Sequence, residues 1–207
     1  MITLAIIVIT GLTSFYAFNN HELFEKLKFN AYAVKHQKQY YRLFTHSLLH
    51  ANMMHLFVNM FVLYIFGSNV ELFFEHAFGA SGTIYYLGLY VGGVIVASLP
   101  AQKKHGDNVH YNAVGASGAV AAVLFSHIVL SPLTSIYILF IPIPIPAFIF
   151  GVLYLIYEAY LDKRGGDGVA HDAHFWGAIF GFVFVIILDY RFLFNFMEEV
   201  KKYITEF

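Results

Sequence analysis

Ser117 is the residue best placed by its neighbours to act as a nucleophile. It lies in Gly115-Ala116-Ser117-Gly118, at the start of an apolar stretch predicted to be helical. Glycines around a serine let backbone N–H groups approach a reacting carbonyl, and the partial positive charge of a helix N-terminus favours a developing oxyanion. The alternative is a face of small residues that only packs against another helix. The pattern alone does not decide between the two.

His174 opens a later apolar stretch whose small residues recur at helical spacing. Ala173, Gly177 and Gly181 lie four residues apart and so form one smooth stripe. Such a stripe permits close contact with the small-faced helix that begins at Ser117. We expect this contact to bring His174 within hydrogen-bonding reach of Ser117, as an activated serine requires. The alternative is an ordinary histidine at the membrane interface.

A third polar cluster contains His55 and Asn59, which lie on one face of a helix because they are four residues apart. Both side chains can donate hydrogen bonds without carrying a charge. Donors of this kind suit an oxyanion hole, where the loss of one typically costs about 10²–10³ in kcat.

A metal site is the alternative for the histidines His46, His50 and His55, since the chain has 11 histidines. However, it contains no H-E-x-x-H motif and lacks the paired Glu-x-x-His motifs of di-iron bundles. It has no cysteine, which excludes disulfides, zinc–thiolate sites and thiol catalysis. We therefore expect no metal and no other cofactor.

The composition is that of an integral membrane protein. Of 207 residues, 59% are hydrophobic and 12% charged, whereas soluble domains carry about 25% charged residues. So few charged groups cannot cover so much apolar surface in water, and lipid must solvate much of it. The net charge of −1 gives no electrostatic basis for binding nucleic acid.

Apolar stretches of about the length of a bilayer crossing recur along the chain. They predict an all-α polytopic membrane protein with one domain over residues 1–207. The six predicted spans lie near residues 1–18, 49–67, 82–99, 114–130, 146–161 and 173–189. The first lacks a basic n-region and a small-residue cleavage pattern, so we expect a retained span rather than a signal peptide.

Three connections between the spans have distinct compositions. Residues 19–50 mix lysines and Arg42 with aromatic residues, as expected for a segment in the membrane interface. The prolines of residues 141–146 exclude a helix and predict a loop, with Pro146 opening the fifth span. Residues 162–168 predict a flexible, glycine-rich loop before the sixth span.

Taken together, these residues resemble the rhomboid family of intramembrane serine proteases. The matching motifs are H-x-x-x-N (His55, Asn59), G-x-S-G (Gly115, Ser117, Gly118) and A-H-x-x-G-x-x-x-G (Ala173, His174, Gly177, Gly181). Weaker matches are Tyr41-Arg42, Phe44-Thr45-His46, His50 and Gly67-x-x-x-Glu71. The ordered set covers nearly all of residues 41–189 and is much more specific than any one motif.

The resemblance implies a six-transmembrane-helix bundle around a water-accessible cavity sunk below the membrane surface. Ser117 would be the nucleophile and His174 the general base and then general acid, in a dyad without a carboxylate. His55, Asn59 and the Ser117 backbone amide would form the oxyanion hole. The supporting glycines would be Gly115, Gly118, Gly177 and Gly181. Substrates would be single-span membrane proteins with small residues at the cut and helix-weakening residues nearby.

Two carboxylates and one departure from the family pattern also have an interpretation. Asp172 precedes His174 by two residues, which face apart on a helix, so we interpret Asp172 as the N-cap of the last span. Glu71 is interpreted as a buried structural acceptor. Many family members carry Tyr four residues after the serine, packed on the histidine, where this chain has Ala121. We therefore expect another group, such as a different aromatic side chain, to hold His174.

Charge and resemblance disagree about orientation. With a cytoplasmic N-terminus, the outer connections carry nine Lys and Arg residues and the inner ones three, which by the positive-inside rule places the site toward the cytoplasm. The resemblance places it on the extracytoplasmic side. We follow the resemblance, because residues 19–50 are expected to form interfacial structure rather than a translocated loop. The lack of an organellar presequence favours a prokaryotic plasma (inner) membrane.

Two other classes of function are alternatives. A non-enzymatic rhomboid-like protein would bind or escort single-span clients, but such proteins typically lack the serine or the histidine, and this chain has both. A transporter or channel would carry charged residues within its spans, where this chain has almost none. The sequence leaves the natural substrate and the oligomeric state open.

Overall fold

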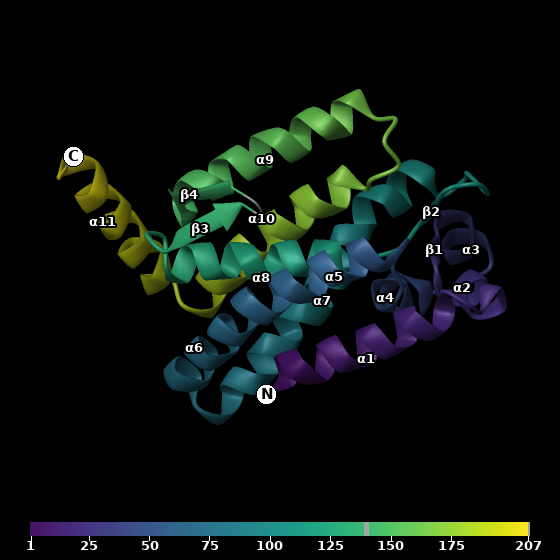
Figure 1. The fold of residues 1–207 in the computed structure, drawn as a ribbon, viewed down its shortest axis with the longest axis horizontal. Helices are drawn as coiled ribbons and strands as arrows, with labels where there is room; N and C mark the ends of the chain where they lie inside the picture. Colours follow the sequence, from purple (N-terminus) through teal and green to yellow (C-terminus); the bar gives the residue numbers. More distant parts are fainter. Residues whose placement is uncertain (139–140, 207) are drawn as a thin grey trace.

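Helices form most of the structure, a computed structural model that describes residues 1–138 and 141–206 (Figure 1). The helices are α1 (Ile2–Ala17), α2 (His21–Leu27), α3 (Ala31–His36), α4 (Arg42–Thr45), α5 (Met53–Val62), α6 (Ser68–Phe78), α7 (Ala80–His105), α8 (Ser117–Leu130), α9 (Ala147–Arg164), α10 (His171–Leu188) and α11 (Arg191–Thr205). A 3₁₀ turn (His46–Leu48) precedes α5, and a π-helical segment (Leu63–Gly67) joins α5 to α6.

The structure is mostly helical, as the all-α prediction requires, and it adds two short antiparallel sheets that were not predicted. Strand β1 (Phe29–Asn30) pairs with β2 (Asn112–Ala113), and β3 (Ser135–Ile138) pairs with β4 (Ile141–Pro146). The loop predicted for residues 141–146 is therefore wrong. Proline lacks an amide donor, but the prolines occupy alternate positions, so the isoleucines between them keep theirs for a two-stranded ribbon.

Each of the six predicted spans corresponds to a helix, with shifted ends. Three are long and apolar enough to cross a membrane: the continuous helix Met53–Phe78, α7 and α10. The apolar helices α1 and α8 are shorter. Helix α9 runs to Arg164, so the loop predicted to begin at Asp162 begins at Gly165, a glycine at φ +59° that ends the helix.

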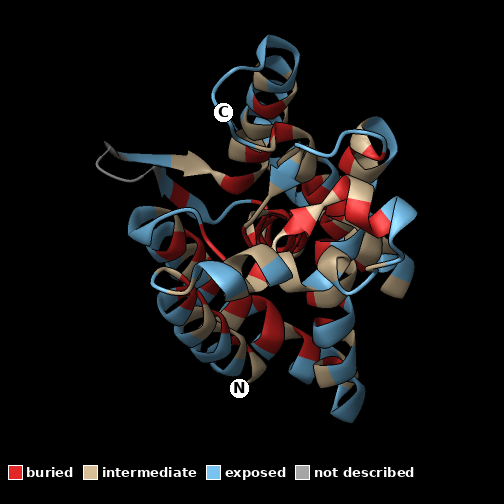
Figure 2. Ribbon diagram, turned by 90° about the vertical axis from the view of Figure 1, so that its right-hand side faces the viewer, coloured by how far each residue is buried: buried red, intermediate tan, exposed pale blue. Residues whose placement is uncertain are grey.

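Helix α8 is the centre of the molecule. All but its first and last residues are buried, because its sequence alternates small and apolar side chains on every face. Figure 2 shows it nearly end-on, as a buried helix with others around it. It ends at Leu130, where Pro132 two residues later cannot continue a helix. A helix surrounded on all sides gives a fixed platform for its first residue, Ser117.

Residues 19–50 form folded structure rather than an extended connection. Asn20 and Asn30 cap α2 and α3 with their side chains, and β1 attaches this segment to β2 directly before α8. Arg42 fixes it further, since its Nη1 donates to the carbonyls of Glu25 and Lys28. This segment lies at the end of the molecule where α8 and α10 begin, on the right of Figure 1.

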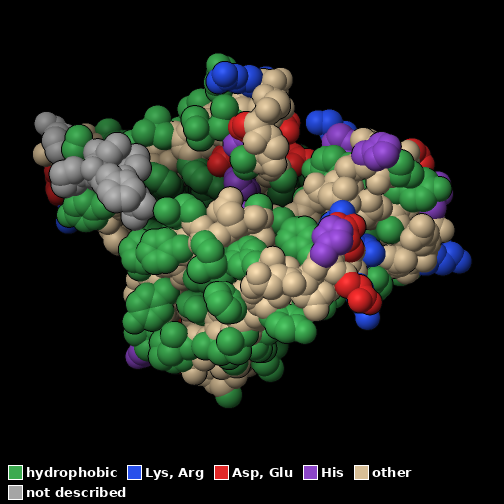
Figure 3. Space-filling model, turned by 45° about the vertical axis from the view of Figure 1, so that its right-hand side comes forward, with side chains coloured by type: hydrophobic (Ala, Val, Ile, Leu, Met, Phe, Trp, Pro, Cys, Tyr) green, Lys and Arg blue, Asp and Glu red, His purple; other side chains and the backbone are tan. Residues whose placement is uncertain are grey.

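The outer surface of the apolar helices is largely hydrophobic. Large hydrophobic side chains are exposed on α1, α5, α7, α9 and α10, and Ile187 near the end of α10 is 78% exposed. Figure 3 shows hydrophobic side chains over the lower part of the visible face, with charged and histidine side chains gathered above and to the right. Exposed apolar surface of this extent needs lipid around it. The chain is a membrane protein, with charged groups both at the end where α8 and α10 begin and on α11.

Candidate active site

Ser117 is the first residue of α8, at the end of a sharply turned loop. Gly115 has φ +130°, a backbone conformation that residues other than glycine rarely adopt. Its N–H donates to the His46 carbonyl at 3.0 Å, which fixes the loop. In the part of the chain that the structure describes, no side chain caps α8. The free amides of its first turn therefore face the space beside the Ser117 hydroxyl.

His46 keeps this loop in place as a neutral side chain. Its Nε2 lies 2.9 Å from the Ser98 hydroxyl on α7, while its backbone carbonyl accepts the Gly115 N–H. Burial lowers the pKa of His46 from 6.5 to about 4, because the charged form loses its hydration. A neutral His46 therefore holds the loop that leads to Ser117 at neutral pH.

The expected close contact between the two small-faced helices is present. A side chain at Gly181 would overlap the Ala122 carbonyl of α8, and one at Gly177 would overlap the Gly118 carbonyl. Ser126 of α8 also donates to the Gly181 carbonyl at 3.0 Å. Only glycine lets the α8 and α10 backbones come this close.

This contact places His174 beside Ser117, although the two residues are 57 positions apart. Nε2 of His174 lies 2.7 Å from Oγ of Ser117, a normal hydrogen-bond length. The arrangement is that of a serine hydroxyl donating to a general base. The predicted proximity of these two side chains is confirmed.

His55 and Asn59 lie on the opposite side of Ser117, on α5. Asn52 caps α5 by accepting the His55 N–H, which fixes the first turn. The Ala51 N–H lies 3.4 Å from Nδ1 of His55, so the ring proton belongs on Nε2. A Cβ at Gly115 would lie 3.1 Å from that Nε2. Asn59 uses one amide hydrogen on the His55 carbonyl and keeps the second for another acceptor.

Glu158 of α9 is a site residue that the sequence interpretation missed. Its Oε2 lies 3.2 Å from Nδ1 of His174 and 2.6 Å from Nδ1 of His171. The dyad predicted to lack a carboxylate therefore has one at its histidine. A signal was available, because Glu158 falls inside a predicted span, and ionisable residues there are expensive and usually functional.

His171 and Asp167 extend this network toward the loop before α10. Nε2 of His171 lies 2.8 Å from Oδ2 of Asp167, and this hydrogen bond lowers the pKa of that exposed carboxyl. The His171 ring thus has a carboxylate at each nitrogen, and it can donate to both only when doubly protonated. His171 thereby links the buried Glu158 to the loop before α10.

Three further interpretations can be compared with the structure. Asp172 is not the N-cap of α10. The helix begins at His171, with Ala170 at the N-cap position, and Asp172 lies in the first turn, where its carboxylate accepts the Ala173 N–H. Glu71 is confirmed as a buried structural acceptor, since its carboxylate accepts the backbone N–H groups of Ile2 and Thr3. The aromatic residue expected to hold His174 is replaced by Glu158 and the His171 ring, 5.9 Å away between centroids.

A metal could in principle bind Glu158, His171 and His174, whose ligand atoms lie within 4.8 Å of one another. Ligands on a tetrahedral zinc are about 3.3 Å apart, since each lies roughly 2.0–2.1 Å from the ion. The 2.6 Å contact between Glu158 and His171 is shorter, and it is the distance of a direct hydrogen bond. The metal candidates of the sequence have other partners: His46 and His50 contact Ser98 and Ser14, and Nδ1 of His55 lies 3.4 Å from the Ala51 amide nitrogen.

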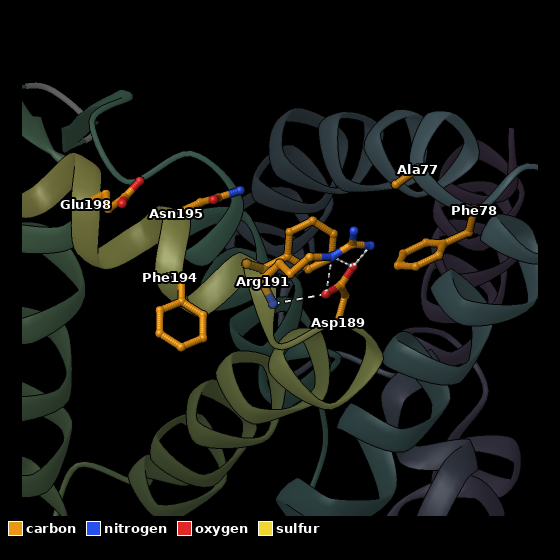
Figure 4. Close-up of a pocket in the computed structure, with 8 residues that line it drawn as sticks. Ala77, Phe78, Asp189, Arg191, Phe194, Asn195 and Glu198 are labelled. Carbon is orange, nitrogen blue, oxygen red and sulfur yellow. Dashed lines mark hydrogen bonds and ion pairs between the residues drawn. The ribbon is translucent and has the colours of Figure 1, made fainter.

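The side chains of the candidate site line one cavity of about 1090 Å³. It is lined by parts of α5, α8, α9, α10 and the loops before α8 and α10; His55, Asn59, Ser117, Ala121, Glu158 and His174 are among its residues. A second cavity, of about 500 Å³, lies between α6 and α11 (Figure 4). Its charged groups include Arg191 and Asp189, which pair with each other, and its lining holds no nucleophile beside a base.

Comparisons with known proteins identify the family of the chain. A family model described as the rhomboid domain matches residues 37–191, well over half of the chain. The chain belongs to the rhomboid family. It is also similar to "RHOMBOID-like protein 12, mitochondrial" of Arabidopsis thaliana, with 28% identity over 151 residues. That match covers 66% of this chain and 43% of the relative, so the chain spans less than half of the relative's length. The rhomboid domain contains Ser117, His174 and every other residue of the cavity named above.

Proposed function

We propose that this rhomboid protein is an intramembrane serine endopeptidase that hydrolyses peptide bonds in or next to transmembrane segments. The observation that carries the proposal is the 2.7 Å contact of Ser117 Oγ with His174 Nε2 inside a large cavity. The position at a helix N-terminus and the donors on α5 add to it. A serine paired with a base beside free N–H donors is the arrangement that acyl transfer requires.

The mechanism begins with attack of Ser117 Oγ on the scissile carbonyl carbon, while its proton passes to Nε2 of His174. The carbonyl oxygen becomes an oxyanion that accepts hydrogen bonds from the Ser117 amide, His55 and Asn59. As the C–N bond breaks, His174 returns the proton to the leaving amine, and Ser117 remains acylated. Water then attacks the acyl group, with His174 again taking and returning the proton, to release the acid.

For the membrane arrangement, we extend the proposal to six crossings, by α1, the continuous helix from α5 to α6, α7, α8, α9 and α10. The cavity then opens near one membrane surface, at the end of the molecule where α8 and α10 begin. Single-span membrane proteins with small and helix-weakening residues near that surface are the proposed substrates, because an unwound segment exposes its carbonyls. An extracytoplasmic site and a prokaryotic plasma membrane stay predictions, and the relative reported above is mitochondrial by name.

The test is co-expression of wild type, Ser117→Ala and Ser131→Ala with a single-span reporter that carries small, Gly and Pro residues near one end of its span. Ser131, just after α8, is the matched control. We expect a released fragment from wild type and Ser131→Ala and none from Ser117→Ala. The compartment that receives the fragment also reports the orientation of the site.

Two results would overturn the proposal. Normal cleavage by Ser117→Ala would exclude Ser117 as the nucleophile. No fragment from any variant, across several reporters and with folded proteins, would favour the non-enzymatic alternative, in which the cavity captures single-span clients without cutting them. Capture of the reporter by purified wild type would then be the measurement that supports that alternative.

A further inference from the structure

The Glu158 carboxylate is buried, with 6% of its side chain exposed, yet it lies on α9, an 18-residue helix with only two other buried residues, Ala147 and Gly151. An ionised carboxylate in such a place is costly unless it is paired. Oε2 of Glu158 faces two imidazoles, His171 at 2.6 Å and His174 at 3.2 Å. His174 therefore has Ser117 at Nε2 and a carboxylate at Nδ1.

We infer that Glu158 is a positioning residue of the reaction, so that Ser117, His174 and Glu158 act as a triad. This inference rests on the proposed function. A carboxylate at Nδ1 keeps the proton on that nitrogen and leaves Nε2 free to accept the Ser117 proton. It also stabilises the imidazolium that forms when His174 takes that proton. The 3.2 Å separation is a close contact between the carboxylate and neutral His174, and it becomes an ion pair when His174 takes the Ser117 proton.

Ala121 gives an independent reason for a carboxylate at this place. It is the cavity-lining residue one turn after Ser117, and its methyl group cannot reach across to hold an imidazole ring. Among the described residues, the ion pair and ring contacts of His174 are with Glu158 and His171. The carboxylate of Glu158 on α9 is therefore the polar group that can orient the ring from its Nδ1 side.

The competing explanation is that Glu158 serves only His171, its nearer partner, as a structural bond between α9 and α10. The two explanations differ in what Glu158→Gln does. Gln keeps the size of Glu and can still bond to His171, so a structural role loses little. It cannot supply the negative charge that fixes the proton on Nδ1 of His174, so a positioning role loses kcat.

The experiment compares purified wild type, Glu158→Gln, Glu158→Asp, His171→Gln and Glu71→Gln on a single-span reporter peptide that wild type cleaves. Glu71→Gln is the matched control, because it neutralises another buried carboxylate, one that accepts backbone N–H groups away from the cavity. We expect Glu158→Gln to lower kcat by about 10²-fold or more with KM within about twofold. Glu158→Asp should recover part of this loss, His171→Gln should lose much less, and Glu71→Gln should keep its kcat.

A second readout does not depend on cleavage. In ¹⁵N-histidine NMR of the detergent-solubilised protein, with His174 assigned from His174→Gln, Glu158→Gln should change the Nδ1 and Nε2 signals of His174. The inference fails if these signals stay unchanged, if Glu158→Gln keeps kcat within about threefold of wild type, or if His171→Gln loses as much as Glu158→Gln. A wild type that neither cleaves nor reacts with a fluorophosphonate probe would refute the proposed function instead, while the NMR still decides the role of Glu158.

Discussion

The two sides of the Ser117 cavity differ in chemistry. The α5 side presents uncharged donors: an Nε2–H of His55 near Gly115 and a spare amide hydrogen of Asn59. The α9 side presents an acceptor, the Glu158 carboxylate, at the far nitrogen of His174. Attack by Ser117 would generate an oxyanion and an imidazolium together. Donors on one side and a carboxylate on the other match that separation of charge.

Packing also differs between the α8–α10 contact and α9. The α8–α10 contact beneath the site is so close that side chains at Gly177 and Gly181 would overlap the α8 backbone. Helix α9 buries only Ala147, Gly151 and Glu158, and exposes most of its remaining surface. Ser117 and His174 thus rest on a rigid contact, whereas the Glu158 carboxylate comes from a peripheral helix. Electrostatic support for a reaction can come from an element that contributes little to the core.

Disrupting the rigid contact should have the largest effect. Gly181→Ala places a methyl group against the Ala122 carbonyl, so α8 and α10 must separate and Ser117 must move away from His174. We expect loss of cleavage of more than about 100-fold, since a displacement near 1 Å already costs that much, and a lower melting temperature in detergent. Gly11→Ala is the control, because a methyl group at Gly11 meets no atom within 4 Å. Equal behaviour of the two variants would show that the α8–α10 contact is not close.

Removing a donor from the α5 side should have the next largest effect. We expect His55→Ala and Asn59→Ala each to lower kcat by roughly 10²–10³-fold, with little change in KM, because the donors act on the transition state. Phe57→Ala, which removes an exposed side chain of the same helix, is the control. Steady-state kinetics on the reporter peptide measures the three variants. A change in KM alone would mean that these residues bind substrate rather than the oxyanion.

Acid should weaken the loop that positions Ser117. The pKa of His46 is about 4 in the folded protein against 6.5 unfolded, so the unfolded chain binds more protons between these values. The contribution of His46 is present in full above pH 6.5 and is lost as the pH falls toward 4, by about 3 kcal/mol at most. Melting temperatures of wild type should therefore fall from pH 7 to pH 4.5. His46→Gln, which cannot titrate, should show a shallower fall; an equal slope would exclude this role.

The smallest effect should follow from trimming the outer face of α9. Ile156→Ala removes side-chain atoms that are 62% exposed, and we expect a change in stability within about 0.5 kcal/mol. Val123→Ala on α8 removes fully buried atoms and should cost about 1–3 kcal/mol. Thermal melts in detergent compare the two, with each kcal/mol shifting the melting temperature by about 2–4 °C. A larger loss for Ile156→Ala would mean that α9 is packed against a partner.

Much of the helical layout and of the Ser117–His174 pair could be predicted from the sequence, because local patterns encode them. Apolar runs of fixed length predict helices, and the four-residue spacing of Ala173, Gly177 and Gly181 predicts a close helix contact. The ends of elements were less predictable. Prolines at alternate positions of residues 141–146 pair as a strand instead of forming a loop, since only a partner strand reveals which amides are used.

The sequence by itself determined that the chain needs lipid, where its six apolar helices lie and which residues could act as nucleophile, base and donors. Composition and spacing are local properties, and they suffice for these conclusions. Tertiary structure alone decided that Glu158 faces His174. That contact depends on the rotation of α9 against α10. This rotation follows from packing between helices, and no spacing within one helix specifies it.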